Sequence, residues 1–136
     1  DEQFMVNLRA PFLLSQAFAR QLPQNTSGRI VNISDARVAR AKNDHFAYRL
    51  TKSALNEMTR MLAVELAPHI TVNALAPGMI LPLAGREEID LGQLIQARIP
   101  LKHSGSLESV ANAVVHLLKQ DFMTGQVVNL DGGEYL

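Results

Sequence analysis

The chain has 136 residues, 47% of them hydrophobic, with 13 basic and 13 acidic side chains and no cysteine. The lack of cysteine excludes disulfides and thiolate catalysis within this sequence. No basic stripe suggests nucleic acid, and no apolar run reaches the ~18 residues of a membrane span. No secretory signal peptide opens the sequence, so we expect a cytoplasmic protein whose partners are small molecules, not nucleic acid or membrane.

Helices and strands alternate along the chain. In order, the patterns predict a helix over Phe4–Leu22, a strand over Arg29–Ile33, a loop over Asp35–Phe46, a helix over Ala47–Ala67, a strand over Ile70–Ala76, a helix over Ser106–Lys119 and a strand over Gln126–Leu130. Ser106 is a candidate N-cap for the last helix. The apolar side of the helix over Ala47–Ala67 is predicted from Leu50, Ala54, Leu55, Met58, Met61, Leu62 and Leu66.

This alternation predicts an α/β fold. Strands that are almost continuously apolar indicate a doubly wound parallel sheet with helices on both faces. Three strands alone would leave a long, apolar edge unpaired, and the sequence opens at Asp1, already at a helix start. We therefore expect residues 1–136 to be the C-terminal part of a single domain whose N-terminal half is absent from this sequence.

Tyr48 and Lys52 form the first candidate pair for catalysis. Four residues apart on one helix, they share a face and lie one turn apart. An ammonium group nearby favours the phenolate, so we expect Lys52 to lower the pKa of Tyr48. Such a tyrosine can exchange a proton with a carbonyl or imine while a hydride moves. An exposed Tyr/Lys pair with no catalytic role would have the same spacing. The spacing alone therefore leaves open whether the pair is catalytic.

The surroundings of this pair carry a family resemblance. The matching stretches are Val6–Leu8, Val31–Ser34, Tyr48-x-x-x-Lys52 with Ser53–Leu55, Val72–Gly78 and Thr124–Gly133. In this order and at about these spacings, they resemble the short-chain dehydrogenase/reductases. The resemblance runs from about residue 4 to the end and implies a Rossmann-type fold that binds NAD(P), with NADPH favoured. The glycine-rich phosphate loop of such folds has no counterpart in this sequence, and Gly132–Gly133 is better explained as a turn.

The resemblance also implies roles for individual residues. Tyr48 would be the proton donor, Lys52 would support it and bind the nicotinamide ribose, and Asn7 would help to hold a water in a proton relay. Pro11 has no N–H, so the carbonyl of Asn7 loses its usual helical donor and is free to accept from a water. The alternative is that Pro11 only kinks or starts the helix.

The segment after the second strand is expected to contact cofactor and substrate. By resemblance, the Pro77–Gly78 turn lies against the nicotinamide, and Ile80 engages the carboxamide through its backbone. The family often has threonine at the position of Pro82, so a side-chain clamp is not expected there. An apolar wall for the substrate, to which Met79 contributes, is predicted from Met79, Ile80, Leu81 and Leu83.

The informative departure from the family is Asp35. Most members have a serine 13 residues before the tyrosine, where this chain has Asp35. Ser34 is one residue early, and neighbours on an extended chain point to opposite faces. Aspartate here resembles the pteridine reductases and the dihydromonapterin (dihydrofolate) reductases. A carboxylate can accept from the N–H groups of a pterin or assist Tyr48 in proton transfer to the ring. Alternatively, Asp35 only starts a turn.

Three hypotheses for function follow. The leading one is NADPH-dependent reduction of a dihydropteridine such as a pterin, dihydromonapterin or dihydrofolate, with catalytic residues Tyr48, Lys52, Asp35 and Asn7. The second is a short-chain oxidoreductase acting on another carbonyl or alcohol, and the third is a non-catalytic homologue that serves as a binding or scaffold subunit. The four histidines lack metal-ligand spacing, so no metal site is expected. By resemblance, the protein is a homotetramer that pairs its two long helices between subunits.

Overall fold

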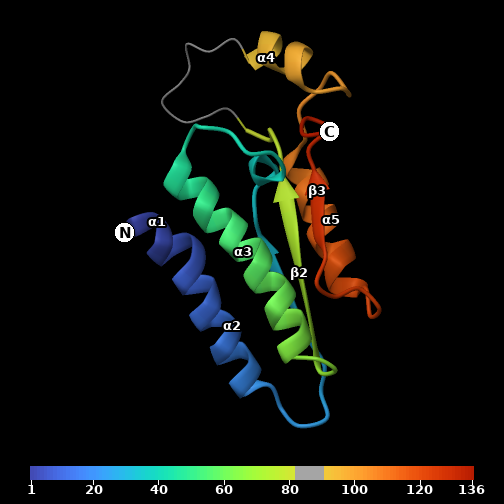
Figure 1. The fold of residues 1–136 in the computed structure, drawn as a ribbon. Helices are drawn as coiled ribbons and strands as arrows, with labels where there is room; N and C mark the ends of the chain where they lie inside the picture. The colour runs from blue at the N-terminus through green and yellow to red at the C-terminus, as the bar shows by residue number, and fades with distance from the viewer. Residues whose placement is uncertain (82–90) are drawn as a thin grey trace.

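The computed structural model describes residues 1–81 and 91–136 (Figure 1). Its elements in chain order are α1 (Glu2–Phe4), η1 (Met5–Arg9), α2 (Ala10–Gln21), β1 (Gly28–Ile33), η2 (Ala36–Ala39), α3 (Phe46–Glu65), β2 (Ile70–Pro77), α4 (Leu91–Arg98), α5 (Leu107–Lys119) and β3 (Val127–Leu130). The three long helices and the three strands expected from the sequence are confirmed, with ends that shift by one or two residues. The short helices η2 and α4 were not expected.

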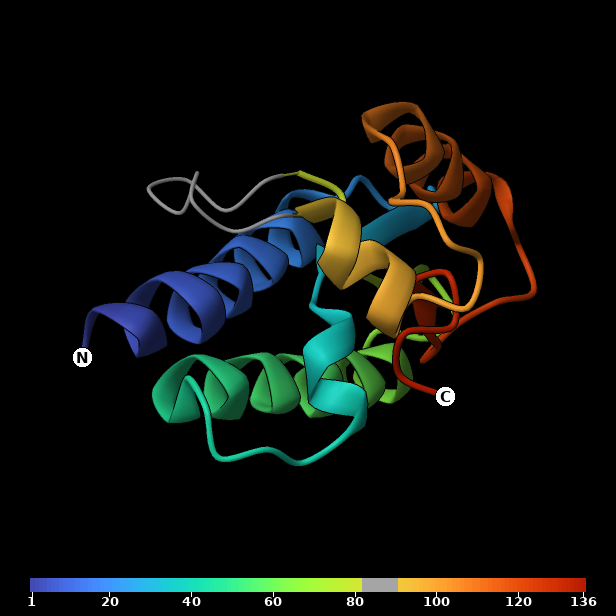
Figure 2. The same ribbon diagram turned by 90° about the horizontal axis from the view of Figure 1, so that it is seen from above.

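The strands form one parallel sheet in the order β1-β2-β3. Helices α2 and α3 lie side by side against one face of the sheet, and α5 covers the other (Figures 1 and 2). Because the strands are parallel, their carboxyl ends all meet at one edge. The predicted α/β architecture is therefore confirmed. Within the described residues, β1 and β3 each pair on one side only.

The core is centred on β2, the middle strand. Val72, Ala74, Leu75 and Ala76 are at most 1% exposed, which reflects helices packed on both faces. Leu55 on α3 and Leu117 on α5 are buried as well. Among the described residues, no helix has both the length and the apolar character needed to cross a lipid bilayer.

The buried face of α3 agrees with the expected one only in part. Leu55 is buried, and Leu62 and Leu66 pack against the core as expected, but Leu50 and Met61 are 46% and 66% exposed. The other buried positions are Arg49, Thr51, Thr59 and Ala63. Small side chains let α3 approach the sheet closely, and their polar atoms are satisfied: the Asn32 amide donates to Thr59 Oγ1 at 2.9 Å, and that hydroxyl donates to the Leu55 carbonyl. A pattern of large apolar residues does not identify the polar and small residues that are buried on this face.

The loop after β3 is a turn, as expected. Gly132 and Gly133 have φ of +61° and +86°, a conformation that favours glycine. The Asp131 carboxylate accepts from the backbone N–H of Gly133 at 2.9 Å and that of Tyr135 at 3.3 Å.

The predicted N-cap of α5 is also confirmed, because Ser106 Oγ accepts from the backbone N–H of Ser109 at 3.0 Å.

Asn73 on β2 connects two parts of the sheet. It is 1% exposed. Its Nδ2 donates to the Met123 carbonyl at 2.8 Å, and its Oδ1 accepts from the Gln126 N–H at 3.0 Å. The side chain therefore holds the segment that leads into β3 against β2. This residue of the Val72–Gly78 motif has a structural role.

Replacing Asn73 by Ala should lower the free energy of unfolding by roughly 1–3 kcal/mol, because it removes a buried side chain and leaves two partly buried backbone groups without partners. Urea unfolding of the full-length protein measures the change. Asn129→Ala on β3 is the matched control, since the side chain of Asn129 is exposed. Equal midpoints for both variants would contradict the structural role of Asn73.

Candidate active site

The carboxyl ends of β1 and β2 bring the candidate residues to one edge of the sheet. Ile33 pairs with Leu75, and the Ser34 N–H donates to the Leu75 carbonyl at 2.7 Å. Asp35 follows directly, with an extended backbone. Open parallel α/β sheets bind ligands outside the carboxyl ends of their strands, and Figure 1 shows η2 and the start of α3 at this edge.

The Asp35 carboxylate has two partners. Tyr48 Oη donates to its Oδ2 at 2.6 Å, and the Arg37 N–H donates to its Oδ1 at 2.7 Å. Asp35 therefore caps the η2 turn, as one interpretation expected, and it also contacts the candidate proton donor Tyr48. Ser34 is buried, and it is Asp35 rather than Ser34 that accepts from the tyrosine.

The electrostatics of Tyr48 differ from the sequence-based expectation. Burial of the phenol, then the hydrogen bond to Asp35 and the negative charge of that residue, raise the pKa of Tyr48 well above its ordinary value of about 10. Arg37 opposes this shift weakly. The expected lowering of the pKa of Tyr48 by Lys52 is wrong for this structure, because a carboxylate is the closer charged partner of the hydroxyl.

Lys52 is directed toward the strand end. Its Nζ donates to the Ile33 carbonyl at 2.8 Å and lies 5.9 Å from the centroid of the Tyr48 ring. Burial lowers the pKa of Lys52, and the charge of Asp35 opposes this. An ammonium group has three hydrogens, so the one bond to Ile33 leaves donor capacity for a ligand at this edge.

Asn7 reaches the site through Thr51. Its Nδ2 donates to Gln3 Oε1 at 2.7 Å and to Thr51 Oγ1 at 3.3 Å, and Thr51 Oγ1 donates to the Tyr48 carbonyl at 2.7 Å. Asn7 lies in η1, a π-helical segment inside a continuous helix. Pro11 therefore neither starts the helix nor supplies an N–H to the Asn7 carbonyl.

The turn after β2 shares this edge. The Gly78 N–H donates to the Leu130 carbonyl at 2.9 Å, and a Cβ at Gly78 would lie 2.8 Å from Asp131 Cα, so only glycine fits. The Met79 carbonyl accepts from the Gly105 N–H at 3.0 Å. In the described chain, no hydrogen bond joins this turn to Asp35 or Tyr48.

The structure describes the segment of the expected apolar wall only as far as Leu81. The side chain of Ile80 packs over Gly105, where an added Cβ would lie 2.4 Å from Ile80 Cδ1. Met79 and Ile80 are partly buried, whereas Leu81 is exposed. Pro82 and Leu83 lie outside the described residues. Helix α4 stands beyond this edge of the sheet (Figure 1).

Arg49 and Thr51 are site residues that the sequence analysis did not single out. Arg49 is 8% exposed although it is charged. Its guanidinium binds Asp44 and the carbonyls of Arg37 and Arg40. The position of Arg49 directly after Tyr48 is the one feature of the sequence that points to it. Its acceptors lie on the 37–44 loop, and the sequence does not predict the path of that loop.

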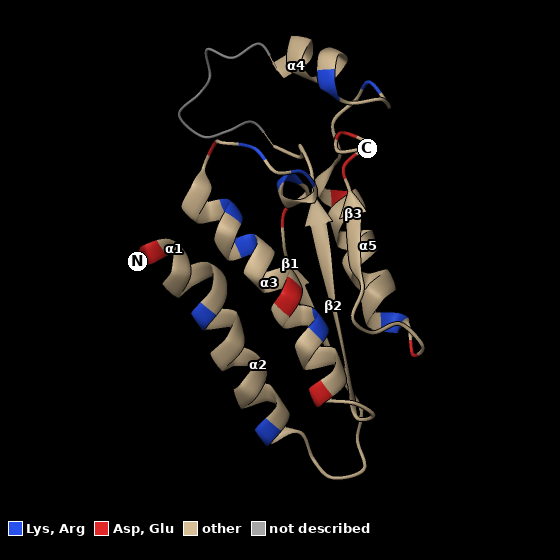
Figure 3. Cartoon of the chain, in the orientation of Figure 1, with Lys and Arg blue, Asp and Glu red and all other residues tan. Residues whose placement is uncertain are grey.

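Basic residues gather around η2, where Figure 3 shows blue segments on η2 and on the adjoining part of α3. Arg37 is half-buried, and Arg40 and Lys42 are exposed. Lys42 Nζ lies 5.6 Å from the centroid of the Tyr135 ring. In residues 1–81 and 91–136, no group of three or more His, Asp or Glu side chains could hold a metal ion.

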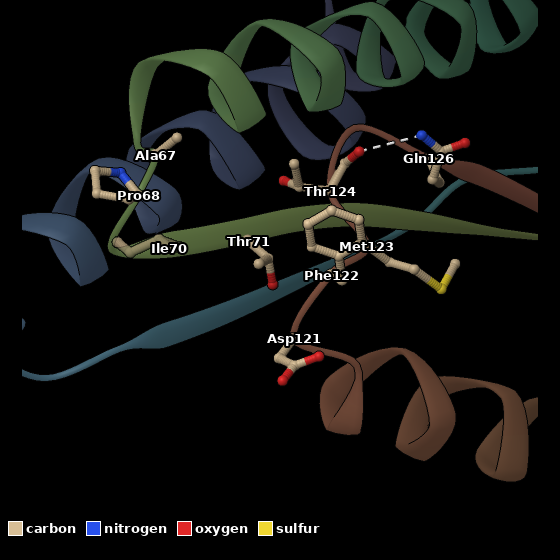
Figure 4. Close-up of a pocket in the computed structure, with 9 residues that line it drawn as sticks. All are labelled: Ala67, Pro68, Ile70, Thr71, Asp121, Phe122, Met123, Thr124 and Gln126. Carbon is tan, nitrogen blue, oxygen red and sulfur yellow. Dashed lines mark hydrogen bonds between the residues drawn. The ribbon is translucent and has the colours of Figure 1, made fainter.

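A pocket of about 570 Å³ lies at the opposite end of the sheet. Figure 4 shows it between the start of β2 and the segment that leads into β3. It is lined by Ala67, Pro68, Ile70, Thr71, Asp121, Phe122, Met123, Thr124 and Gln126. This is the amino end of β2, opposite to the edge that holds Asp35 and Tyr48, so the pocket is not part of the candidate site.

Comparisons with known proteins agree with this arrangement. The family model described as enoyl-(acyl carrier protein) reductase matches residues 1–134. L-xylulose reductase of Mesocricetus auratus is 37% identical over 98% of this chain and 57% of its own length. The 3-oxoacyl-[acyl-carrier-protein] reductase FabG of Aquifex aeolicus is 38% identical, over 99% and 56%. The solved structure of FolM alternative dihydrofolate reductase 1 from Brucella canis, complexed with NADP, is 37% identical with a TM-score of 0.89, over 98% of this chain and 52% of that one.

The chain belongs to the short-chain dehydrogenase/reductase family, and its sheet and helices form part of the Rossmann-type fold of that family. It spans about half the length of the curated relatives that it matches. The relatives differ in the substrates that their names give, so membership defines the class of oxidoreductase and not the molecule it reduces.

Replacing Asp35 by Asn should lower the pKa of Tyr48, because the amide keeps a hydrogen-bond acceptor but removes the negative charge that disfavours the phenolate. Burial of the phenol remains, so the pKa should stay above its ordinary value. NMR of carbon-labelled tyrosine over an alkaline pH series measures the shift, with Tyr48→Phe to assign the signal. An unchanged or higher pKa in Asp35→Asn would refute this account.

Proposed function

We propose that the protein containing this chain is an NADPH-dependent oxidoreductase that reduces a dihydropteridine-type substrate. The observation that carries the proposal is the 2.6 Å hydrogen bond from Tyr48 to the Asp35 carboxylate. A pterin presents N–H donors along its edge and a ring C=N bond to be reduced, and a carboxylate accepts from such donors. A ketone has no N–H, and a carboxylate beside its oxygen would repel the negative charge that develops during reduction.

Tyr48 acts as the acid in this proposal. Its hydroxyl is protonated at neutral pH, so a proton is available for the ring nitrogen. Burial and Asp35 raise the pKa of Tyr48 and make it a weaker acid, so the proposal requires that bound substrate and cofactor lower this pKa. Asp35 orients that hydroxyl and accepts from the substrate. By resemblance to the family, Asn7 helps to hold the water that returns a proton to the site, and Pro11 offers no N–H that would compete for the Asn7 carbonyl.

The residues at the carboxyl edge fit a nicotinamide cofactor. Lys52 keeps donors for the ribose hydroxyls, the Pro77–Gly78 turn offers a close-packed backbone surface, and Ile80 offers backbone groups to the carboxamide. When bound, NADPH supplies the hydride. We infer that residues 1–136 form the C-terminal catalytic part of one domain and that the phosphate-binding loop belongs to the other part. The FolM structure complexed with NADP supports this cofactor.

A second candidate function is reduction of another carbonyl compound. It is favoured by relatives such as L-xylulose reductase, at 37% identity, and FabG, at 38%. In that case the Asp35 carboxylate would only cap the η2 turn. A scaffold or binding subunit without activity is a weaker candidate. Asn7, Thr51, Tyr48 and Asp35 are linked by hydrogen bonds, and Lys52 lies beside the Tyr48 ring at the same edge of the sheet.

Asp35→Ser separates the two enzymatic candidates. In the full-length protein, we expect NADPH consumption with dihydropterins or dihydrofolate and little with simple ketones, sugars or quinones. The serine variant should lose pterin reduction by about 100-fold or more, since it removes the acceptor for the substrate N–H groups. Initial rates with both classes of substrate test this.

Tyr48→Phe is the matched control for that comparison. It should abolish turnover of every substrate, because both candidates need the same proton donor. Ketone reduction by the native protein, with Asp35→Ser unaffected, would retain the family chemistry and reject the pteridine substrate. Full activity of Tyr48→Phe would reject the mechanism itself.

We propose further that the protein is a homo-oligomer, most simply a tetramer. Large apolar side chains on α2 and α3 are exposed, namely Phe12, Leu13, Leu14, Met61 and Val64, and these two helices lie side by side (Figure 2). Light scattering of the full-length protein should give four times the mass of one chain, and Val64→Glu should reduce it. A native mass of one chain would contradict the proposal.

A further inference from the structure

Arg49 is the least exposed charged residue among those the structure describes. It follows Tyr48 on α3 and is 8% exposed. Its Nε donates to Asp44 Oδ1 at 2.7 Å, and its Nη1 donates to the Arg40 carbonyl at 2.9 Å and to the Arg37 carbonyl. A buried guanidinium is stable only when such partners compensate for its lost hydration.

All three acceptors belong to the segment between Asp35 and α3. The backbone of Arg37 is critical because it bonds on both sides. The Arg37 N–H donates to Asp35 Oδ1, and the Arg37 carbonyl accepts from Arg49. The other oxygen of Asp35 accepts from Tyr48. A closed circuit of hydrogen bonds therefore runs from Arg49 through Arg37 and Asp35 to Tyr48, the neighbour of Arg49 on the same helix.

We propose that Arg49 is a positioning residue that holds the Asp35 carboxylate in register with the Tyr48 hydroxyl. The inference rests on the proposed function for its meaning in catalysis, but the geometry that it describes does not depend on the substrate. Arg49 does not contact the reacting atoms. It acts by keeping η2 and the following loop at a fixed distance from α3.

The direction of its donors supports this role over substrate binding. The guanidinium faces protein acceptors, whereas Arg40 and Lys42 on the same loop are exposed and remain accessible. Desolvation opposes ionisation of Asp44, yet the hydrogen bond and charge of Arg49 hold the pKa of that carboxyl below its usual value. Lysine cannot reproduce the fork that serves Asp44 and two carbonyls at once.

The first test uses Arg49→Met and Arg49→Lys in the full-length protein. Release of the loop should lower kcat roughly 10- to 100-fold for the methionine variant, because a small displacement of Asp35 misaligns the proton donor. The KM for NADPH should remain unchanged, and lysine should rescue part of the loss. Arg60→Met is the matched control, since Arg60 lies on the same helix but pairs with Glu57 at the surface.

A readout independent of turnover is the pKa of Tyr48, followed by NMR of carbon-labelled tyrosine. In Arg49→Met the pKa should fall toward that of Asp35→Asn. In an Asp35→Asn background, Arg49→Met should then add little, because both changes act through the contact between residue 35 and Tyr48, and the charge at residue 35 is already gone. A merely structural arginine would leave the pKa of Tyr48 unchanged in Arg49→Met, and that result would overturn the proposal.

Hydrogen exchange of the 36–45 segment completes the experiment. Arg49→Met should accelerate exchange there while the amides of the second half of α3 keep their protection. If the Arg49 variants do not fold, Asp44→Ala carries the same test with one acceptor removed. Unchanged exchange and an unchanged pKa of Tyr48 in a folded variant would refute the positioning role. A native protein that reduces no pterin, with these shifts still present, would refute only the proposed substrate.

Discussion

The contact on which the site depends is the hydrogen bond between Tyr48 and Asp35. A half-buried phenol that donates to a carboxylate at 2.6 Å retains its proton more firmly than a phenol in water. The same property makes the phenol a weaker acid, so proton donation from Tyr48 depends on what binds beside it. The lysine one turn away, which would favour the phenolate, is instead bonded to the Ile33 carbonyl. Burial and the Asp35 carboxylate therefore set the electrostatic character of Tyr48 in this structure.

The parallel sheet makes this contact possible. Parallel strands bring their carboxyl ends to one edge, so the residues that follow β1 and β2 become neighbours although they are distant in the sequence. Helix α3 then returns along the sheet and presents Tyr48 and Lys52 to the end of β1. The buried polar bonds of Asn32, Thr59 and Asn73 fix the spacing of these layers. The hydrogen bonds that hold the layers together thus also position the Tyr48–Asp35 contact. Arg49 links the two, because it binds the loop that carries Asp35 and lies on α3.

Membership of a family does not by itself identify a substrate. Relatives whose names indicate sugar, acyl and folate substrates match nearly the whole of this chain at 37–38% identity. The Asp35 side chain is where this chain departs from the usual pattern, and it contacts the proton donor directly. The side chain at position 35 can favour one substrate over another by accepting hydrogen bonds from it or by repelling its charge.

The sequence by itself determined the order of helices and strands, the parallel sheet, and the placement of Asp35 and Tyr48 near one another. Those features follow from local periodicity and from motifs at fixed spacing. It did not determine the buried face of α3, where Thr51, Thr59 and Ala63 pack in place of Leu50 and Met61. Nor did it reveal the raised pKa of Tyr48, the partner of Lys52 or the burial of Arg49. Only the tertiary structure decided these, because burial and the identity of the closest charge depend on contacts between segments that are far apart in the chain.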